Sequence, residues 1–300
     1  MDTPRLGVAV STVGRPAIAG LLTSLATGGT APTAVVVADQ SAGGTARGLA
    51  GDRAADAGWV PSSGGASRGR NDAVAALGEV GEVDVLAFPN DDCRYPHDTL
   101  TAVLERFRAD PGLAALAVTL VDPAGPRLRL PADGTELDRR SVWRAIEPAT
   151  FVRASVFAEL RGFDERIGTG GPTPWQSGEI TDLLLRALAR GHRVVAAPGI
   201  EVRAPGEVRA LDAARYRSKV RGYNRGAGHV YRTHRYGLAT RLGFLVMPWV
   251  RLVQGRRLGA SEIALTWQRG LGRLEGLLGR TVGRDGPDWL ETRRPRAAPR

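Results

Sequence analysis

Cysteine is almost absent from this sequence of 300 residues, because Cys93 is the only one. An intramolecular disulfide is therefore impossible, and a reducing compartment is expected. The first residues also lack the basic segment and apolar core of a secretory signal peptide. No stretch approaches the ~20 consecutive apolar residues that a membrane-spanning helix needs. These absences predict a cytoplasmic location.

Lysine is equally rare, since Lys219 is the only lysine among 41 basic residues. The charge is distributed unevenly along the chain. From Gly206 onward there are 20 basic and 7 acidic residues, a net charge of +13, whereas the first 205 residues have a net charge of −3. Opposite charges in two parts of one chain suggest two regions with different tasks. A basic region alone is compatible with nucleic acid, an anionic membrane or an acidic substrate.

Short apolar segments alternate with amphipathic segments over the first 200 residues. Strands are expected at residues 6–12, 34–38, 83–88, 113–121 and 192–197. Helices are expected at residues 16–26, 45–57, 96–108 and 181–190, and another begins at residue 71. This alternation predicts a mostly parallel α/β sheet flanked by helices.

Polar side chains follow three of these expected strands. They form the clusters Ser11-Thr12, Asp39-Gln40-Ser41 and Asn90-Asp91-Asp92. Ligands of open parallel sheets bind outside the carboxyl ends of the strands, where all three clusters fall. Their convergence indicates a site more strongly than any one cluster, because a lone aspartate after a strand is usually a turn or helix cap.

The remaining segments suggest three regions. Residues 122–147 are rich in proline, glycine and charge and predict an irregular excursion, and residues 151–160 are apolar again. A Gly/Pro-rich loop is expected at residues 166–177. The pattern after Gly206 is mainly helical. We therefore expect an α/β domain at residues 1–205, a basic helical region at 206–284 and a flexible tail at 285–300.

Six segments, in this order, resemble family 2 glycosyltransferases of the GT-A fold. They are residues 10–16 (VSTVGRP), 35–41 (VVVADQS), 67–71 (SRGRN), 88–93 (FPNDDC), 160–165 (LRGFDE) and 175–186 (WQSGEITDLLLR). The resemblance covers roughly residues 5–205 and implies a GT-A nucleotide-sugar domain followed by a helical extension. It also implies inverting transfer of a sugar from a UDP-, dTDP- or GDP-sugar to an acceptor hydroxyl on a glycan, a lipid-linked molecule or a small molecule.

The segment around Asn90 resembles the metal-binding DXD motif. By resemblance Asp92 contacts a divalent cation, Mg²⁺ or Mn²⁺, and Asn90 stands where the first aspartate usually is. Such cations prefer oxygen ligands, commonly one or two carboxylates together with substrate phosphates. Asparagine still offers an oxygen but removes one negative charge. The alternative interpretation is an acidic turn between Pro89 and Cys93.

The nucleotide itself is expected to contact four residues. By resemblance Thr12 and Asp39 meet the base and ribose, and Asp91 joins them beside the predicted metal position. Asp39 can accept hydrogen bonds from a base or a ribose hydroxyl, and Arg70 can hold a phosphate or a base edge. The alternatives are a loop cap for Asp39 and a solvated helix start for Arg70.

Inverting transfer needs a carboxylate that takes the proton from the acceptor hydroxyl. Glu179 and Asp182 are the candidates, because Ile180 occupies the position where the family often has its second acidic residue. Both also suit the first turn of a helix, whose dipole favours acidic residues. Trp175 is expected either to stack on an acceptor sugar or to anchor its loop.

A further departure from the family is Ala204, where relatives often have a histidine near the metal. With Asn90 and Ile180 it keeps a second hypothesis open, a non-catalytic GT-A-like module that binds a nucleotide sugar or a partner protein.

The basic C-terminal region contains an apolar run at residues 242–250, flanked by Arg241 and Arg251. One interpretation is a helix packed on the catalytic domain, with its arginines facing solvent. The other is a segment that lies in the plane of an anionic membrane surface, which would make the protein peripheral on the inner face of the membrane. Nucleic acid is not expected as a partner, because no recognition motif accompanies the charge.

Overall fold

The computed structural model describes residues 3–206, 213–255 and 259–282. The chain divides into two compact units, the first formed by Met1–Asp164 and Glu179–Val208 and the second by Glu165–Gly178 and Arg209–Arg300. The predicted boundary after residue 205 stays a prediction, and the tail predicted at 285–300 lies outside the described residues. Among the residues that are described, no helix is long and apolar enough to cross a membrane.

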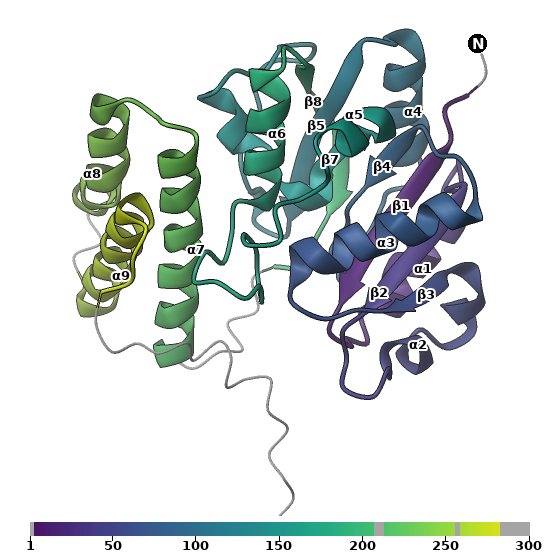
Figure 1. The fold of residues 1–300 in the computed structure, drawn as a ribbon, viewed down its shortest axis with the longest axis horizontal. Helices are drawn as coiled ribbons and strands as arrows, with labels where there is room; N and C mark the ends of the chain where they lie inside the picture. Colours follow the sequence, from purple (N-terminus) through teal and green to yellow (C-terminus); the bar gives the residue numbers. More distant parts are fainter. Residues whose placement is uncertain (1–2, 207–212, 256–258, 283–300) are drawn as a thin grey trace, which may run out of the picture. The chain divides into compact units, whose positions relative to one another are not determined.

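An eight-stranded sheet forms the centre of the first unit (Figure 1). Its strands are β1 (Leu6–Thr12), β2 (Ala34–Asp39), β3 (Gly58–Pro61), β4 (Val85–Ala87), β5 (Leu113–Asp122), β6 (Gly125–Pro126), β7 (Thr150–Arg153) and β8 (Arg193–Arg203). The order is β3-β2-β1-β4-β7-β5-β6, and β8 also pairs with β5. β1 pairs with β2 and β4 in parallel and is buried at nearly every position, which explains its continuous apolar sequence.

Helices on the sheet close the core of the first unit. They are α1 (Ile18–Ala26), α2 (Ala46–Leu49), α3 (Ala66–Val80), α4 (Thr99–Ala109), α5 (Ala154–Glu159) and α6 (Glu179–Ala189). The buried faces of α1 and α4 join the strands in one apolar cluster. α3 packs on β1 and β2 and lies in front of them in Figure 1. The predicted α/β architecture, with its C-terminal helical part, is thus confirmed.

Three details differ from the sequence-based expectation. The helix expected at residues 45–57 ends at Leu49 and continues as a 3-10 helix, Gly51–Asp56, because Gly51 has a φ of +58° that a regular helix does not accommodate. β3 was not expected, since its four residues are too short to show a period. β7 runs antiparallel to β4 and β5, whereas the alternation of elements predicted a parallel neighbour.

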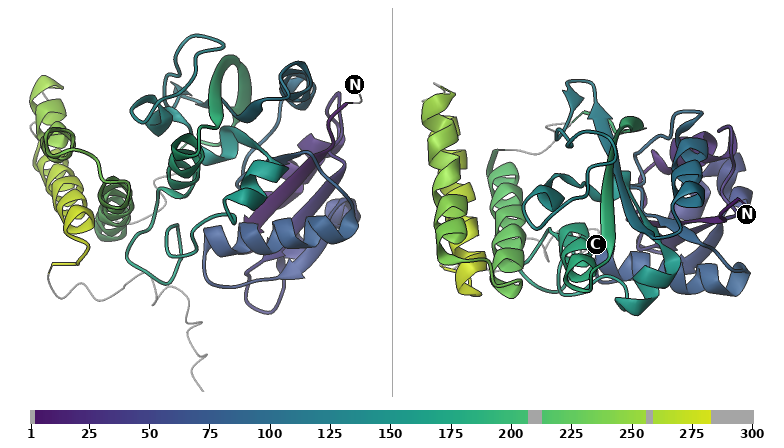
Figure 2. Two further views of the ribbon diagram at one scale, coloured as in Figure 1. Left: turned by 45° about the horizontal axis from the view of Figure 1, so that its top comes forward. Right: turned by 90° about the horizontal axis from the view of Figure 1, so that it is seen from above.

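The second unit contains three helices among its described residues, α7 (Ala213–Thr233), α8 (Leu238–Gln254) and α9 (Ala260–Leu278). α7 and α9 lie side by side in both views of Figure 2. Glycine makes this approach possible, because a Cβ atom at Gly228, Gly272 or Gly276 would overlap the backbone of the opposite helix. The prediction of a mainly helical region is confirmed by these three helices.

A buried ion cluster joins the same two helices. The carboxylate of Glu275 is fully buried and accepts hydrogen bonds from Arg221 Nη2 at 2.6 Å and from the backbone N–H of Val282 at 2.7 Å. Arg225 Nε donates to the other carboxylate oxygen at 2.5 Å. Burial alone would raise the pKa of Glu275, but the two arginines outweigh it and hold the pKa below its ordinary value. The cluster is therefore charged at neutral pH.

Candidate functional site

The three polar clusters predicted to converge do meet at one edge of the sheet. Thr12 lies opposite Asp39 in the parallel register of β1 and β2, and Ser11 forms an isolated bridge with Asn90. The Thr12 hydroxyl donates a hydrogen bond of 2.6 Å to Asp91 Oδ2. The ends of β1, β2 and the chain after β4 therefore form one polar surface, as the sequence predicts.

Asp91 is a buried acidic group of this surface. Burial raises its pKa, while the hydrogen bond from Thr12 and the charge of Arg15 act in the opposite direction. Arg15 Nη1 lies 3.3 Å from Asp91 Oδ1 and 3.6 Å from Asp92 Oδ2, so one guanidinium pairs with both carboxylates. Arg15 is not among the site residues predicted from the sequence. Its place in the segment 10–16, immediately after β1, is the signal that could have found it.

The predicted metal ligands Asn90 and Asp92, and Asp91 between them, differ in how available their oxygens are. Asn90 Oδ1 already accepts a hydrogen bond of 3.0 Å from Arg70 Nη2, and Asp91 is engaged by Thr12 and Arg15. The Asp92 side chain is 29% exposed. No group of three or more histidine, cysteine or acidic side chains is arranged for a metal within the described residues. Asp92 fits a cation that takes most of its remaining ligands from phosphates and water.

Arg70 is buried, not solvated. Its side chain is 5% exposed and forms an ion pair with Glu147, in addition to its hydrogen bond to Asn90. Burial overturns the alternative in which Arg70 is a solvated helix start. Arg70 Nε has no hydrogen-bond partner among the described residues, which leaves one buried donor unsatisfied.

Glu147 contacts Arg70 in the candidate site but is not among the residues predicted from the sequence. It begins the 3-10 helix Glu147–Ala149, immediately before β7, and is buried. Burial raises the pKa of its carboxyl to about 8; the Arg70 guanidinium lowers the pKa and the Glu179 carboxylate raises it. Glu147 lies at the end of an irregular segment without periodicity or a recognisable motif, so no sequence signal marks it.

The raised pKa of Glu147 predicts a pH dependence of stability. The folded state holds this proton more tightly than the unfolded chain, so the stabilisation is complete below the unfolded pKa of 4.5 and is lost as pH rises through about 8. We expect the difference in free energy of unfolding between wild type and Glu147→Gln to decrease by at least about 1 kcal/mol over this range in urea titrations. Glu82→Gln, at an 88% exposed side chain, is the control. A difference that is constant or grows with pH would contradict the prediction.

Asp39 caps the loop that follows β2, which is the alternative interpretation of this residue. Its carboxylate accepts hydrogen bonds from the backbone N–H of Ser41 at 2.8 Å and of Ala46 at 3.1 Å. These bonds hold the loop between β2 and α2. A part in nucleotide binding stays a prediction for Asp39, and likewise for Thr12.

The two candidate bases have different surroundings, although both lie in the first turn of α6. Asp182 is buried and accepts a hydrogen bond of 2.8 Å from Arg186 Nε, and Arg186 in turn donates to the carbonyl oxygens of Leu160 and Gly162. Glu179 is half-buried and interacts electrostatically with Glu147. Asp182 thus orients Arg186 toward the chain just after α5, whereas Glu179 is close enough to Glu147 to raise the pKa of its carboxyl.

Trp175 belongs to the second unit. Its indole ring stacks on the imidazole of His229, with ring centroids 4.6 Å apart and planes inclined by 12°. In the same loop, Ser177 Oγ donates to the carbonyl oxygen of Tyr223 at 2.6 Å. These contacts anchor the loop on α7 and cover one face of the indole. Acceptor binding by Trp175 stays a prediction.

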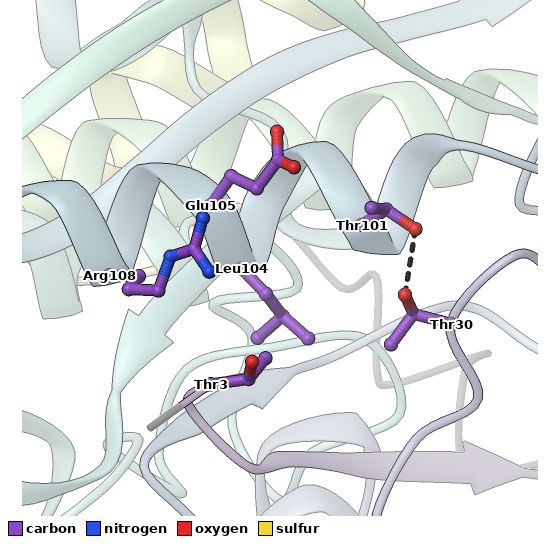
Figure 3. Close-up of a pocket in the computed structure, with 6 residues that line it drawn as sticks. All are labelled: Thr3, Thr30, Thr101, Leu104, Glu105 and Arg108. Atoms are coloured by element: carbon purple, nitrogen blue, oxygen red, sulfur yellow. Dashed lines mark hydrogen bonds between the residues drawn. The ribbon is translucent and has the colours of Figure 1, made fainter. Parts of the chain in front are cut away.

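A separate pocket includes Thr3, which comes just before β1, whereas Thr12 is the last residue of that strand. Figure 3 shows the side chains that line this pocket. Thr3, Thr30, Thr101, Leu104, Glu105 and Arg108 line it. A hydrogen bond of 2.7 Å joins Thr30 and Thr101 in this lining. None of the predicted site residues lines this pocket, so it is not the nucleotide site that the sequence predicts.

The sheet order, the site at the carboxyl ends of β1 and β2 and the C-terminal helices define a GT-A-like α/β fold. The mannosyltransferase PcManGT from Pyrobaculum calidifontis, solved with GDP-Man and Mn²⁺, is similar with a TM-score of 0.62 and 14% identity, over 93% of this chain and 88% of that one. Residues 1–349 of S. aureus TarS are similar with a TM-score of 0.55 and 14% identity, over 92% of each chain. A structure of the same TarS fragment contains UDP-GlcNAc.

These likenesses establish the fold. No protein-family model and no curated protein sequence matches the chain.

Proposed function

We propose that this chain is an inverting, nucleotide-sugar-dependent glycosyltransferase of family 2. The observation that carries the proposal is the meeting of Thr12, Asp39, Asp91 and Asp92 at the carboxyl ends of parallel strands in a GT-A-like fold. That edge is where open α/β sheets bind nucleotides. The complexes of PcManGT with GDP-Man and of TarS with UDP-GlcNAc give further support for a nucleotide-sugar donor.

Arg70 supports a phosphate-binding role. Its guanidinium is buried, is held by Glu147 and Asn90, and has an unsatisfied Nε donor. A buried donor without a partner costs roughly 1–3 kcal/mol, which an anionic ligand would recover. A phosphate oxygen is a suitable acceptor, because bonds between guanidinium and phosphate are charge-assisted and directional. Arg70 is therefore proposed to contact the diphosphate.

Glu179 is proposed as the base. In the transfer step the acceptor oxygen forms a bond to the anomeric carbon while the bond from that carbon to the diphosphate breaks, and the hydroxyl proton passes to Glu179. Attack from the face opposite the leaving group inverts the anomeric configuration. A divalent cation at Asp92, Mg²⁺ or Mn²⁺, would neutralise charge on the departing diphosphate. The acceptor is proposed to be a glycan, a lipid-linked molecule or a small molecule with a free hydroxyl.

The second candidate is a non-catalytic module that binds nucleotide sugar. The observation that favours it is the internal neutralisation of the acidic cluster, since Arg15 pairs with Asp91 and Asp92 and Arg70 takes the oxygen of Asn90. A protein of this kind would bind the donor without transferring or hydrolysing the sugar. Incubation with labelled UDP-, dTDP- and GDP-sugars and a panel of acceptors separates the two candidates. Product NMR then reports the anomeric configuration, which the proposal requires to be inverted.

The donor site is tested by calorimetry with UDP, dTDP and GDP, with and without Mn²⁺. We expect one of these diphosphates to bind more tightly when Mn²⁺ is present. In Asp92→Ala this enhancement should fall by about tenfold or more, ~1.4 kcal/mol of binding free energy, because the accessible carboxylate is removed. A binding ligand should also raise the melting temperature of the wild type.

The matched control is Asp98→Ala, which removes a carboxylate that is 92% exposed at the start of α4. It should bind like the wild type. Unchanged metal-dependent affinity in Asp92→Ala would contradict the assignment of Asp92. Failure of every diphosphate to bind at millimolar concentration would contradict the donor site itself.

A further inference from the structure

One side of α8 consists of exposed apolar side chains. The exposed fractions are 73% for Leu238, 52% for Leu242, 51% for Val246, 41% for Met247, 38% for Val250 and 69% for Val253. Their spacing places them on one side of the helix, where Ala239 and Gly243 fill the intervening positions without charge. The apolar side runs for about 22 Å along the helix. We call these six side chains the α8 apolar face.

α9 extends this surface with a second exposed apolar stripe. Its members are Ile263, Trp267, Leu274 and Leu278, and Trp267 is 61% exposed. Trp249 of α8 meets Trp267 edge to face, with ring centroids 5.2 Å apart, so the two helices are in contact where the stripes adjoin. Large apolar surfaces of this kind on a folded protein generally mark a binding site.

The other side of α8 is already packed within the second unit. Phe244 stacks on Tyr231 with ring centroids 4.1 Å apart, and the guanidinium of Arg273 lies over the Phe244 ring at 4.2 Å. Pro248 is buried as well. The helix is therefore anchored on α7 and α9, and this packing accounts only for the side opposite the α8 apolar face.

The charges around this surface are almost all positive. The described residues from Ala213 to Val282 include twelve arginines and lysines but only two acidic residues. One of the two, Glu275, is buried and neutralised by Arg221 and Arg225. Exposed Arg235 and Arg251 lie just before α8 and in its last turn. An occupant of the apolar face must therefore be compatible with a cationic rim.

We propose that the α8 apolar face and the adjoining stripe of α9 lie in the plane of an anionic lipid surface. Apolar side chains would enter the acyl boundary, and the arginines would contact lipid phosphates. A second copy of the chain is disfavoured as the occupant, because it would bring two arginine-rich rims together without acidic partners. The inference does not depend on whether the first unit transfers sugar.

Vesicle co-sedimentation of the full chain tests this proposal. The wild type should sediment with vesicles of phosphatidylcholine and phosphatidylglycerol, remain in the supernatant with phosphatidylcholine alone, and be released by high salt. The double variant Leu242→Glu, Val246→Glu should partition at least about tenfold less strongly, because two charges would enter the apolar boundary. Val80→Glu, at a 65% exposed apolar position of α3, is the matched control and should sediment like the wild type.

A second measurement avoids dependence on the double variant. Brominated anionic lipid should quench the tryptophan fluorescence of the wild type. The variant Trp267→Phe should lose a measurable part of that quenching while it still sediments, and further replacement of the adjoining Trp249 by phenylalanine should remove most of the rest. A wild type that stays in the supernatant with anionic vesicles would overturn the proposal. The proposal would also be overturned if Val80→Glu lost as much sedimentation as the double variant. The same holds if light scattering shows that the wild type is a dimer, that the double variant is a monomer, and that neither binds lipid.

Discussion

Glu179→Gln is expected to lower the rate of sugar transfer by about 10²–10⁴-fold, the usual contribution of a positioned general base. The amide cannot accept the acceptor's proton but preserves the size and polarity of the side chain. Donor affinity should stay within about twofold of the wild-type value, because the donor contacts proposed here involve other residues. Initial rates with the active donor and acceptor, and calorimetry with the corresponding diphosphate, measure the two quantities separately.

Asp182→Asn is the matched control for this experiment. Asp182 is buried in the same turn of α6 and is bound to Arg186, which holds the carbonyl oxygens of Leu160 and Gly162. Its loss should lower the melting temperature and leave most of the transfer rate. Loss of transfer in Asp182→Asn alone would reverse the assignment of the base. Donor binding without transfer or hydrolysis in the wild type would favour the non-catalytic module.

The positions of the polar clusters could be predicted because they depend on strand direction. Thr12 and Asp39 are the last residues of apolar strands and Asn90 follows one, and parallel strands bring such ends to one edge of the sheet. The same reasoning could not find Glu147. Its proximity to Arg70 arises because β7 inserts antiparallel between β4 and β5, and no local pattern in the sequence encodes that insertion.

The sequence also could not predict which side chains of the candidate site pair with one another. Asn90 was expected to offer its oxygen to a metal, but that oxygen accepts a hydrogen bond from Arg70. Arg15 pairs with the two neighbouring aspartates, although nothing in its local sequence specifies these partners. Such contacts depend on rotamers and on burial in the folded chain. Motif order therefore predicted which segments meet, whereas the ion pairs among their side chains depend on the folded structure.

In the C-terminal region, composition alone gave an incomplete expectation of where the charged side chains lie. Its excess of arginine suggested a solvated or lipid-facing surface, yet Arg221 and Arg225 are buried around Glu275. The glycines at 228, 272 and 276 lie inside helices, although glycine disfavours the helical conformation. Here they let α7 and α9 approach closely enough for the ion cluster to form between them. Composition alone could not distinguish the buried arginines from the exposed ones.

Glu275→Ala is expected to lower the free energy of unfolding of the second unit by about 3–5 kcal/mol, because it leaves two buried guanidinium groups without a counter-charge. Urea unfolding of the full chain, followed by tryptophan fluorescence and circular dichroism, measures the loss. Glu262→Ala is the matched control, since it removes the other acidic residue of α9 and should cost at most about 1 kcal/mol through the helix dipole.

The expected loss of stability in Glu275→Ala comes mainly from burying Arg221 and Arg225 without a counter-charge, and less from losing the attraction within the ion pairs. Replacing Glu275, Arg221 and Arg225 together by methionine should therefore recover most of the lost stability, because no uncompensated charge then remains between the helices. A loss below about 1 kcal/mol in Glu275→Ala would show that Arg221 and Arg225 reach solvent once the carboxylate is gone. Failure of the triple methionine variant to recover stability would instead show that the charged cluster specifies how α7 and α9 pack.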